Sequence, residues 1–161
     1  MNIKYNKFSS VRGEKMNIEE YLSNFYKGTK NPNLNAMNYF MDEFGHPEKN
    51  LKFIHIAGTN GKGSCTEIIT NILIQAGYKV GKFLSPHLIK YNERMAINNQ
   101  NITDAKMEKL IKKIEPIIEK YNFLHDSKVT LFELETTMAM LYFAENNCDF
   151  VVLEVGLRWF V

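Results

Sequence analysis

Residues 51–64 read Leu51-Lys52-Phe53-Ile54-His55-Ile56-Ala57-Gly58-Thr59-Asn60-Gly61-Lys62-Gly63-Ser64, a short apolar run followed by a glycine-rich turn. The run indicates a β-strand buried on both faces, in which His55 would be a hydrogen-bonded core residue. A helix is expected after the turn, because apolar residues recur three and four positions apart: Cys65, Ile68, Ile69, Ile72, Leu73 and Ala76. Backbone N–H groups between a strand and a helix bind anions, so this stretch predicts a phosphate-binding loop.

The side chains of this turn fit a nucleoside triphosphate. Lys62 would place its ammonium on the β- and γ-phosphates, and Ser64 would offer a hydroxyl to Mg²⁺. The turn departs from the common pattern G-x-x-x-x-G-K-[ST], because Ile56 stands at the first glycine position and Gly63 separates Lys62 from Ser64. The alternative is a generic glycine turn with a solvated lysine. The flanking strand and helix favour the phosphate loop.

The rest of the chain alternates between helical and extended patterns. Helices are expected over residues 17–25, 34–44, 103–121 and 130–146, and strands over 79–84 and 149–155, with a turn at Asn98-Asn99. Gly45 is expected to cap the second helix, Thr103 to begin the third, and Thr130 with Glu133 to form a capping box on the fourth. Pro116 is expected to kink or split the third helix. The alternation predicts an α/β fold, a parallel sheet with flanking helices.

The composition is that of one globular domain. The chain has 161 residues, within the ~100–200 usual for a domain. Its 45% hydrophobic and 24% charged residues exclude collagen-like, mucin-like and wholly disordered classes. The net charge of +2 is scattered, which argues against a nucleic-acid partner. No apolar run approaches the ~20 residues of a membrane span, and the two cysteines form no metal-spacing pair, so a cytoplasmic location is expected. Residues 1–15 are expected to be a disordered extension.

Glu154 interrupts the apolar run that begins at Phe150. Burying a carboxylate without a partner costs several kcal/mol, so Glu154 is expected at the carboxyl end of its strand, where open α/β sheets bind ligands. Near a phosphate loop, an acid at that position can hold Mg²⁺ directly or through water. In the absence of such a loop, Glu154 would be interpreted as a solvent-exposed residue.

Further motifs accompany the loop Gly58-Thr59-Asn60-Gly61-Lys62-Gly63-Ser64. They are Leu84-Ser85-Pro86-His87-Leu88 with Asn92-Glu93-Arg94, Thr130-Leu131-Phe132-Glu133-Leu134-Glu135-Thr136, and Val152-Leu153-Glu154-Val155-Gly156-Leu157. In this order they resemble folylpolyglutamate synthase/dihydrofolate synthase, of the Mur ligase superfamily, from about Met16 to Leu157. The resemblance implies a P-loop-type ATPase domain and an ATP-dependent ligase that adds L-glutamate to folate or dihydropteroate. Phosphorylation of the substrate carboxylate would give an acyl phosphate, which the glutamate amine attacks. The family implies Mg²⁺, small-molecule substrates, no membrane, and a monomer at full length.

The resemblance also implies a set of site residues, carried over position by position. The ATP loop would be Asn60, Gly61, Lys62, Gly63 and Ser64, with Lys62 catalytic, and the magnesium ligands would be Ser64, Ser85 and Glu154. A mobile loop that shapes the pterin site would include Ser85, Pro86, His87 and Arg94. The same substrate would be contacted by Thr130, Leu131, Phe132 and Glu133 and, on a weaker match, by Thr29 and Lys30. The capping box alone also explains Glu133, and a strand-ending turn also explains Ser85-Pro86.

The resemblance breaks after Leu157, where Arg158-Trp159-Phe160-Val161 replaces the family's Gly-Gly-Arg continuation. A one-base frame shift would produce this change. Residues 16–161 are therefore expected to be an incomplete N-terminal ATP-binding domain whose C-terminal domain is absent, with impaired activity and an exposed strand edge that favours aggregation. The alternatives are a non-catalytic nucleotide-binding remnant and another Mur-type amide ligase. A kinase or GTPase is disfavoured by the Ser85-Pro86-His87 loop and by the lack of a guanine-reading motif.

Overall fold

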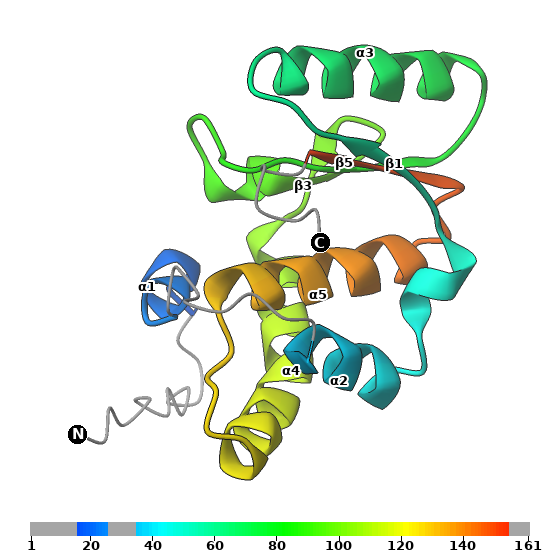
Figure 1. Ribbon diagram of the computed structural model, residues 1–161. Coiled ribbons are helices and arrows are strands. Elements are labelled where there is room, and N and C mark those ends of the chain that lie inside the picture. Colours follow the sequence, from blue (N-terminus) through cyan, green and yellow to red (C-terminus); the bar gives the residue numbers. More distant parts are fainter. Residues whose placement is uncertain (1–15, 26–34, 155–161) are drawn as a thin grey trace.

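A five-stranded sheet organises the protein in the computed structural model, which describes residues 16–25 and 35–154 (Figure 1). The helices are α1 (Ile18–Ser23), α2 (Asn35–Glu43), α3 (Lys62–Gln75), α4 (Asp104–Leu124) and α5 (Leu131–Glu145), with short 3₁₀ turns η1 (Pro47–Asn50) and η2 (Tyr91–Arg94). The strands are β1 (Lys52–Ile56), β2 (Val80–Phe83), β3 (Met95–Ile97), β4 (Gln100–Asn101) and β5 (Phe150–Glu154). The expected α/β class is confirmed.

The strands lie in the order β1-β5-β2-β3-β4. β5 runs parallel to both β1 and β2, so the carboxyl ends of these three strands share one edge of the sheet. At that edge Ile56 of β1 lies beside Glu154 of β5. β3 and β4 add an antiparallel hairpin whose turn has positive φ at Asn98 and Asn99 (48° and 63°). The parallel sheet is thus confirmed, with an antiparallel extension.

The helices form a layer on each face of the sheet. α3 covers one face, and α5 covers the other with α4 and α2 beyond it (Figure 1). The core lies mainly on the α5 side, where Phe143 and Leu134 of α5, Ile111 and Ile114 of α4 and Phe40 of α2 are fully buried. Among the described helices, none combines the length and apolar character that crossing a bilayer requires.

The expectation that the first strand is buried on both faces is wrong. β1 pairs with β5 and, within the described residues, with no other strand, so it forms an edge of the sheet. Lys52 and His55 are exposed, and the His55 ring makes an edge contact with Phe53 rather than a place in the core. An apolar run indicates a strand but does not say whether a second strand or helix covers it.

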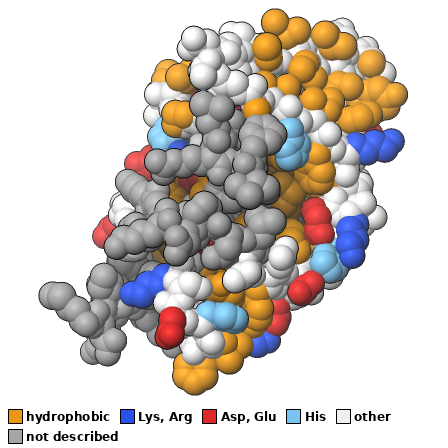
Figure 2. Space-filling model, viewed as in Figure 1, with side chains coloured by type: hydrophobic (Ala, Val, Ile, Leu, Met, Phe, Trp, Pro, Cys, Tyr) orange, Lys and Arg blue, Asp and Glu red, His pale blue; other side chains and the backbone are white. Residues whose placement is uncertain are grey.

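The helix after the glycine turn is confirmed, but its apolar stripe faces outward. Ile68 and Ile72 are 59% and 62% exposed, whereas Thr66 and Thr70 are buried against the sheet. Figure 2 shows hydrophobic side chains gathered over α3 at the top of the view. Periodicity identified the residues that share a face of this helix, but the smaller threonine face packs on the strands.

An ion pair explains this orientation of α3. Lys82, buried on β2, donates to Glu67 Oε1 at 2.6 Å and to Asn99 Oδ1 at 3.2 Å. The Asn99 amide in turn donates to Asn71 Oδ1 at 2.9 Å. These contacts join the middle of α3 to the sheet and to the hairpin turn, and they hold the threonine face inward.

The structure confirms the predicted start of α4 at Thr103 and the predicted end of α2 at Gly45. Lys106 N–H donates to Thr103 Oγ1 at 3.3 Å at the start of α4. Gly45 has a φ of 69° after α2, and His46 N–H reaches back to Met41 O at 2.7 Å, as in a glycine-terminated helix.

α4 continues through Pro116 as one 21-residue helix, so the proline does not split it. Pro116 and Lys112 lie on the exposed side, where water can bond the Lys112 carbonyl that the proline leaves without its helical donor. We expect Pro116→Ala to raise the free energy of unfolding by about 1–2 kcal/mol, since the restored hydrogen bond outweighs the lost restriction of the unfolded chain. Urea unfolding measures this, with the exposed Glu119→Ala as a control expected within about 0.5 kcal/mol of the parent. An unchanged or lower stability of Pro116→Ala would contradict the expectation.

Candidate functional site

The predicted phosphate loop, residues 58–64, lies between β1 and α3, at the shared carboxyl edge of the parallel strands. Gly61 occupies the N-cap of α3 with a φ of 76°, which glycine adopts without strain, and it has no side chain to cap the helix. Lys62 Nζ donates to the carbonyls of Gly58 at 2.9 Å and Thr59 at 3.4 Å, so the ammonium lies across the loop. Asn60, Gly61, Gly63 and Ser64 are exposed. The first amides of α3 and the Lys62 ammonium are therefore available to an anion.

Glu154 lies at the end of β5 beside this loop, as expected for an acid at the carboxyl end of its strand. A Cβ placed on Gly63 would be 3.8 Å from Glu154 Oε2, so the carboxylate borders the first turn of α3. Partial burial raises the pKa of Glu154, and the charge of Lys62 opposes that rise. The Glu154 side chain is half-buried and lies near the Lys62 ammonium. This environment would also accommodate a metal cation beside the carboxylate.

The oxygen donors at this edge fit Mg²⁺. Ser64 lies in the first turn of α3, Glu154 ends β5, and Ser85 follows β2, so all three residues stand near the carboxyl ends of adjacent parallel strands. Within the described ranges there is no cluster of three or more His, Cys, Asp or Glu residues that could hold a metal alone. Hydroxyl and carboxylate oxygens with few protein ligands suit Mg²⁺, which keeps waters and is completed by phosphate oxygens.

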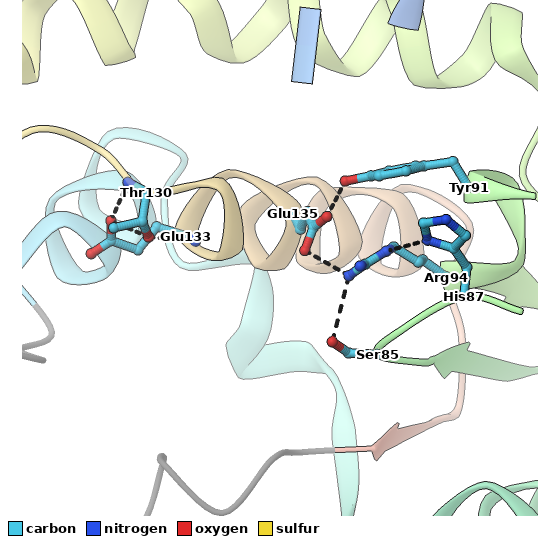
Figure 3. Close-up of polar contacts among 7 residues, drawn as sticks. All are labelled: Ser85, His87, Tyr91, Arg94, Thr130, Glu133 and Glu135. Carbon is cyan, nitrogen blue, oxygen red and sulfur yellow. Dashed lines mark hydrogen bonds and ion pairs between the residues drawn. The ribbon is translucent and has the colours of Figure 1, made fainter. Parts of the chain in front are cut away.

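The segment from Ser85 to Arg94 is held by a cluster of polar side chains (Figure 3). The Arg94 guanidinium donates to Glu135 Oε2 at 2.9 Å, to His87 Nδ1 at 3.1 Å and, weakly, to Ser85 Oγ at 3.5 Å. It also lies over the Tyr91 ring, 5.1 Å from its centroid, and the Tyr91 hydroxyl donates to Glu135 Oε1. The cluster brings together three of the predicted residues, Ser85, His87 and Arg94.

Burial dominates the electrostatics of this cluster. It raises the pKa of the Glu135 carboxyl, against which the Tyr91 hydrogen bond and the Arg94 charge act. Burial and the neighbouring Glu135 charge both raise the pKa of Tyr91. Tyr91 therefore stays protonated and serves as a donor to the carboxylate.

A second carboxylate shapes the tip of the same segment. The backbone N–H groups of Leu88, Ile89 and Lys90 all donate to Glu93, at 2.8, 3.1 and 3.0 Å. These bonds lower the pKa of Glu93. Leu88 and Ile89 project outward and are almost fully exposed, and the exposed Pro86 precedes them after a cis peptide bond.

Thr130 and Glu133 form the predicted capping box at the start of α5. Glu133 N–H donates to Thr130 Oγ1 at 3.3 Å, and the Thr130 N–H and hydroxyl donate to Glu133 Oε2 at 2.7 and 2.8 Å. The two residues precede Glu135 on the same helix and point away from the Arg94 cluster (Figure 3). Leu131 and Phe132 are half-buried, with the Phe132 ring against Phe83 at the end of β2. The capping geometry fully accounts for Glu133 in the protein alone.

Not every predicted site residue can be placed, and two residues of the Arg94 cluster were not predicted from the sequence. Thr29 and Lys30 lie outside the described residues. Glu135 and Tyr91 were not predicted as part of the site. A signal for Glu135 was present, since it is a carboxylate inside a nearly all-apolar helix without a capping role. Nothing in the pattern around Tyr91 marked it.

The chain matches known ligases over most of its length. It is 42% identical over 127 residues to dihydrofolate synthase/folylpolyglutamate synthase of Bacillus subtilis, covering 78% of this chain and 30% of that protein. No protein-family model matches the sequence.

Solved structures give the same result. Folylpolyglutamate synthase of Thermotoga maritima superimposes with a TM-score of 0.79 at 39% identity, covering 87% of this chain and 32% of that one. A folylpolyglutamate synthase complex with AMPPCP and folate gives a TM-score of 0.79 at 30% identity, over 85% of this chain and 34% of that one. The Mur ligase type of fold that the motifs implied is confirmed. The chain is therefore a relative of the folylpolyglutamate synthase/dihydrofolate synthase family and spans about a third of the length of the members it matches.

Proposed function

We propose that this chain binds MgATP at the loop from Gly58 to Ser64 and forms the ATP-binding part of a ligase that joins L-glutamate to folate or dihydropteroate. The observation that carries the proposal is the placement of Glu154 against the first turn of α3, directly beside a glycine loop with a lysine across it. The likeness to a structure holding an ATP analogue and folate supports the same assignment.

Lys62 would supply the positive charge for the phosphates. Its ammonium is bonded to two neutral carbonyls, and phosphate oxygens are stronger, charge-assisted acceptors. Binding of a triphosphate would therefore turn the ammonium from the loop toward the β- and γ-phosphates, while Asn60, Gly61, Gly63 and Ser64 contribute backbone N–H groups. Transfer of the γ-phosphate to a substrate carboxylate gives a good leaving group, and the loop would hold the transferred charge in position.

Ser64, Ser85 and Glu154 would hold Mg²⁺ at the same edge. When bound, the ion neutralises charge on the phosphate oxygens and leaves the phosphoryl group more easily attacked. The protein's part is to place two hydroxyls and one carboxylate at the ends of adjacent strands. The raised pKa of Glu154 falls as a cation approaches, so binding favours the charged carboxylate.

The folate or dihydropteroate substrate would lie between the segment Ser85 to Arg94 and the start of α5. Pro86, His87 and Arg94 come from the segment, and residues 130–133 come from the helix, with Thr29 and Lys30 as further proposed contacts. The exposed Leu88 and Ile89 give the segment an apolar surface suited to a flat aromatic ligand. A cytoplasmic location, a monomeric state and the lack of a nucleic-acid partner stay predictions.

Isothermal titration tests the binding part of the proposal. AMPPCP with and without Mg²⁺ should bind the chain, more tightly with the ion, and UDP-linked peptides should not bind. The absence of AMPPCP binding by a folded chain would overturn the assignment. Ligation of radiolabelled glutamate to dihydropteroate or folate then tests the reaction, and AMPPCP binding without ligation would identify the chain as a nucleotide-binding part that does not catalyse on its own.

A further inference from the structure

Glu135 is the one buried carboxylate in the described part of the chain that has no capping or ligand role above. Only 2% of its side chain is exposed, in the second turn of α5. A buried carboxylate is costly unless it is paired and hydrogen-bonded, and an apolar side chain of similar size would fill the same place more cheaply. A buried carboxylate at this position of α5 therefore points to a task other than packing.

The contacts of Glu135 converge on Arg94. Glu135 Oε2 accepts from Arg94 Nη1 at 2.9 Å, and Oε1 accepts from the Tyr91 hydroxyl. The Tyr91 ring lies under the guanidinium. Glu135 therefore holds both the Arg94 guanidinium and the aromatic ring that packs against it. Arg94 is itself almost buried, with 11% of its side chain exposed, and removal of its carboxylate partner would leave an uncompensated cation.

Arg94 in turn contacts Ser85 and His87, at the start of the segment. Its Nε–H donates to His87 Nδ1 at 3.1 Å, and Nη1 approaches Ser85 Oγ at 3.5 Å. Arginine can only donate, so His87 Nδ1 must accept and the neutral ring carries its proton on Nε2. The arginine thereby fixes the tautomer and the rotation of His87, whose ring also lies 5.2 Å from that of Tyr91.

The tip of the segment depends on a different carboxylate. Leu88, Ile89 and Lys90 are bonded through their backbone to Glu93, within the segment itself. Glu135 of α5, by contrast, contacts Tyr91 and Arg94 near the end of the segment and so joins the segment to the helix (Figure 3). Glu93 therefore stabilises the conformation of the tip of the segment, and Glu135 fixes the position of the segment relative to α5.

We propose that Glu135 is a positioning residue, which acts through Arg94 to hold Ser85 and His87 at the carboxyl end of β2. This proposal rests on the proposed function, in which Ser85 binds Mg²⁺ and His87 contacts folate. Glu135 contacts no ligand itself. The consequence is that the folate and metal side of the site depends on Glu135, while the phosphate loop does not.

NMR spectroscopy of the full chain provides a direct test. In the parent, the Arg94 Nε–H should be protected from exchange and His87 should be the Nε2–H tautomer. In Glu135→Gln the exchange of Arg94 Nε–H should rise roughly tenfold or more, the loss expected for one charged hydrogen bond, and His87 should become a tautomeric mixture. The matched control is Glu145→Gln on the same helix, which pairs with Lys106 and Lys113 and should leave both signals unchanged.

Titration separates positioning from a general loss of structure. Glu135→Gln should bind folate roughly tenfold more weakly but bind metal-free AMPPCP within about twofold of the parent. A folded Glu135→Gln with parental Arg94 exchange, or parental folate affinity in a chain that binds folate, overturns the proposal. If the parent binds neither ligand, the proposed function fails, and the NMR comparison still decides the role of Glu135.

A second variant covers the case in which Glu135→Gln does not fold. Arg94→Lys keeps a positive charge opposite Glu135 but lacks the forked guanidinium that reaches His87 and Ser85. It should fold, release the His87 tautomer and weaken folate binding as the first variant does. Unchanged His87 signals in folded Arg94→Lys would show that order does not pass through the arginine.

Discussion

Lys62→Ala is expected to weaken the binding of MgAMPPCP by about thirtyfold or more while the protein remains folded. The ammonium lies across the phosphate loop and contacts the carbonyls of Gly58 and Thr59. Removal of one partner of a close charge pair costs about 2–5 kcal/mol, and each 1.4 kcal/mol is about tenfold in affinity. One of the lost contacts to loop carbonyls is part-buried and the other is exposed, so the free energy of unfolding should change by no more than about 1 kcal/mol. Isothermal titration measures the affinity and urea unfolding the stability.

Lys112→Ala is the matched control for this result. Lys112 makes a surface ion pair with Glu108 one turn earlier on α4, so its removal takes away the same charge without touching the loop. It should bind nucleotide as the parent does. Equal affinity of Lys62→Ala and the parent would show that this lysine does not contact the phosphates.

Gly81→Ala is expected to destabilise the fold by about 1–3 kcal/mol or more. A Cβ on Gly81 would lie 2.6 Å from Cδ1 of the Phe143 ring, which is fully buried in α5. β2 is held between β5 and β3, so the strand has no free side toward which it could move. Alanine restricts the unfolded chain more than glycine does, but that gain of up to about 1 kcal/mol is smaller than the cost of the clash. Urea unfolding gives the difference.

The partner ring provides the control. Phe143→Leu alone should destabilise by leaving a small cavity, yet in the Gly81→Ala background it should restore part of the stability because it removes the atoms in conflict. The two changes should therefore be coupled by about 0.5–3 kcal/mol. Strictly additive effects would mean that the contact between strand and ring is not the cause.

The sequence predicted those parts of the fold that depend on neighbouring residues. The glycine loop, the capping threonines Thr103 and Thr130 and the position of Glu154 at a strand end all follow from spacing over a few residues, and the structure has them. The functional roles of these residues stay predictions, because they concern ligands.

The remaining features depend on distant parts of the chain. The exposure of Ile68 and His55 depends on which elements pack against α3 and β1. The spacing of apolar residues does not predict those neighbours. Glu135 is separated by 41 residues from Arg94, and only the packing of α5 under η2 shows that they meet. A buried carboxylate reveals that a partner exists without identifying it.

The pairing of Ile56 with Glu154 has a consequence for how this site can diverge. Neighbouring strands are spaced by the hydrogen-bond ladder at about 4.8 Å, so the gap between the glycine loop after β1 and the acid is set by main-chain geometry rather than by side-chain packing. Substitutions in the surrounding helices can accumulate without altering that gap. A slip of one residue between the two strands, however, would turn the acid to the opposite side of the sheet and separate the two halves of the site in a single step.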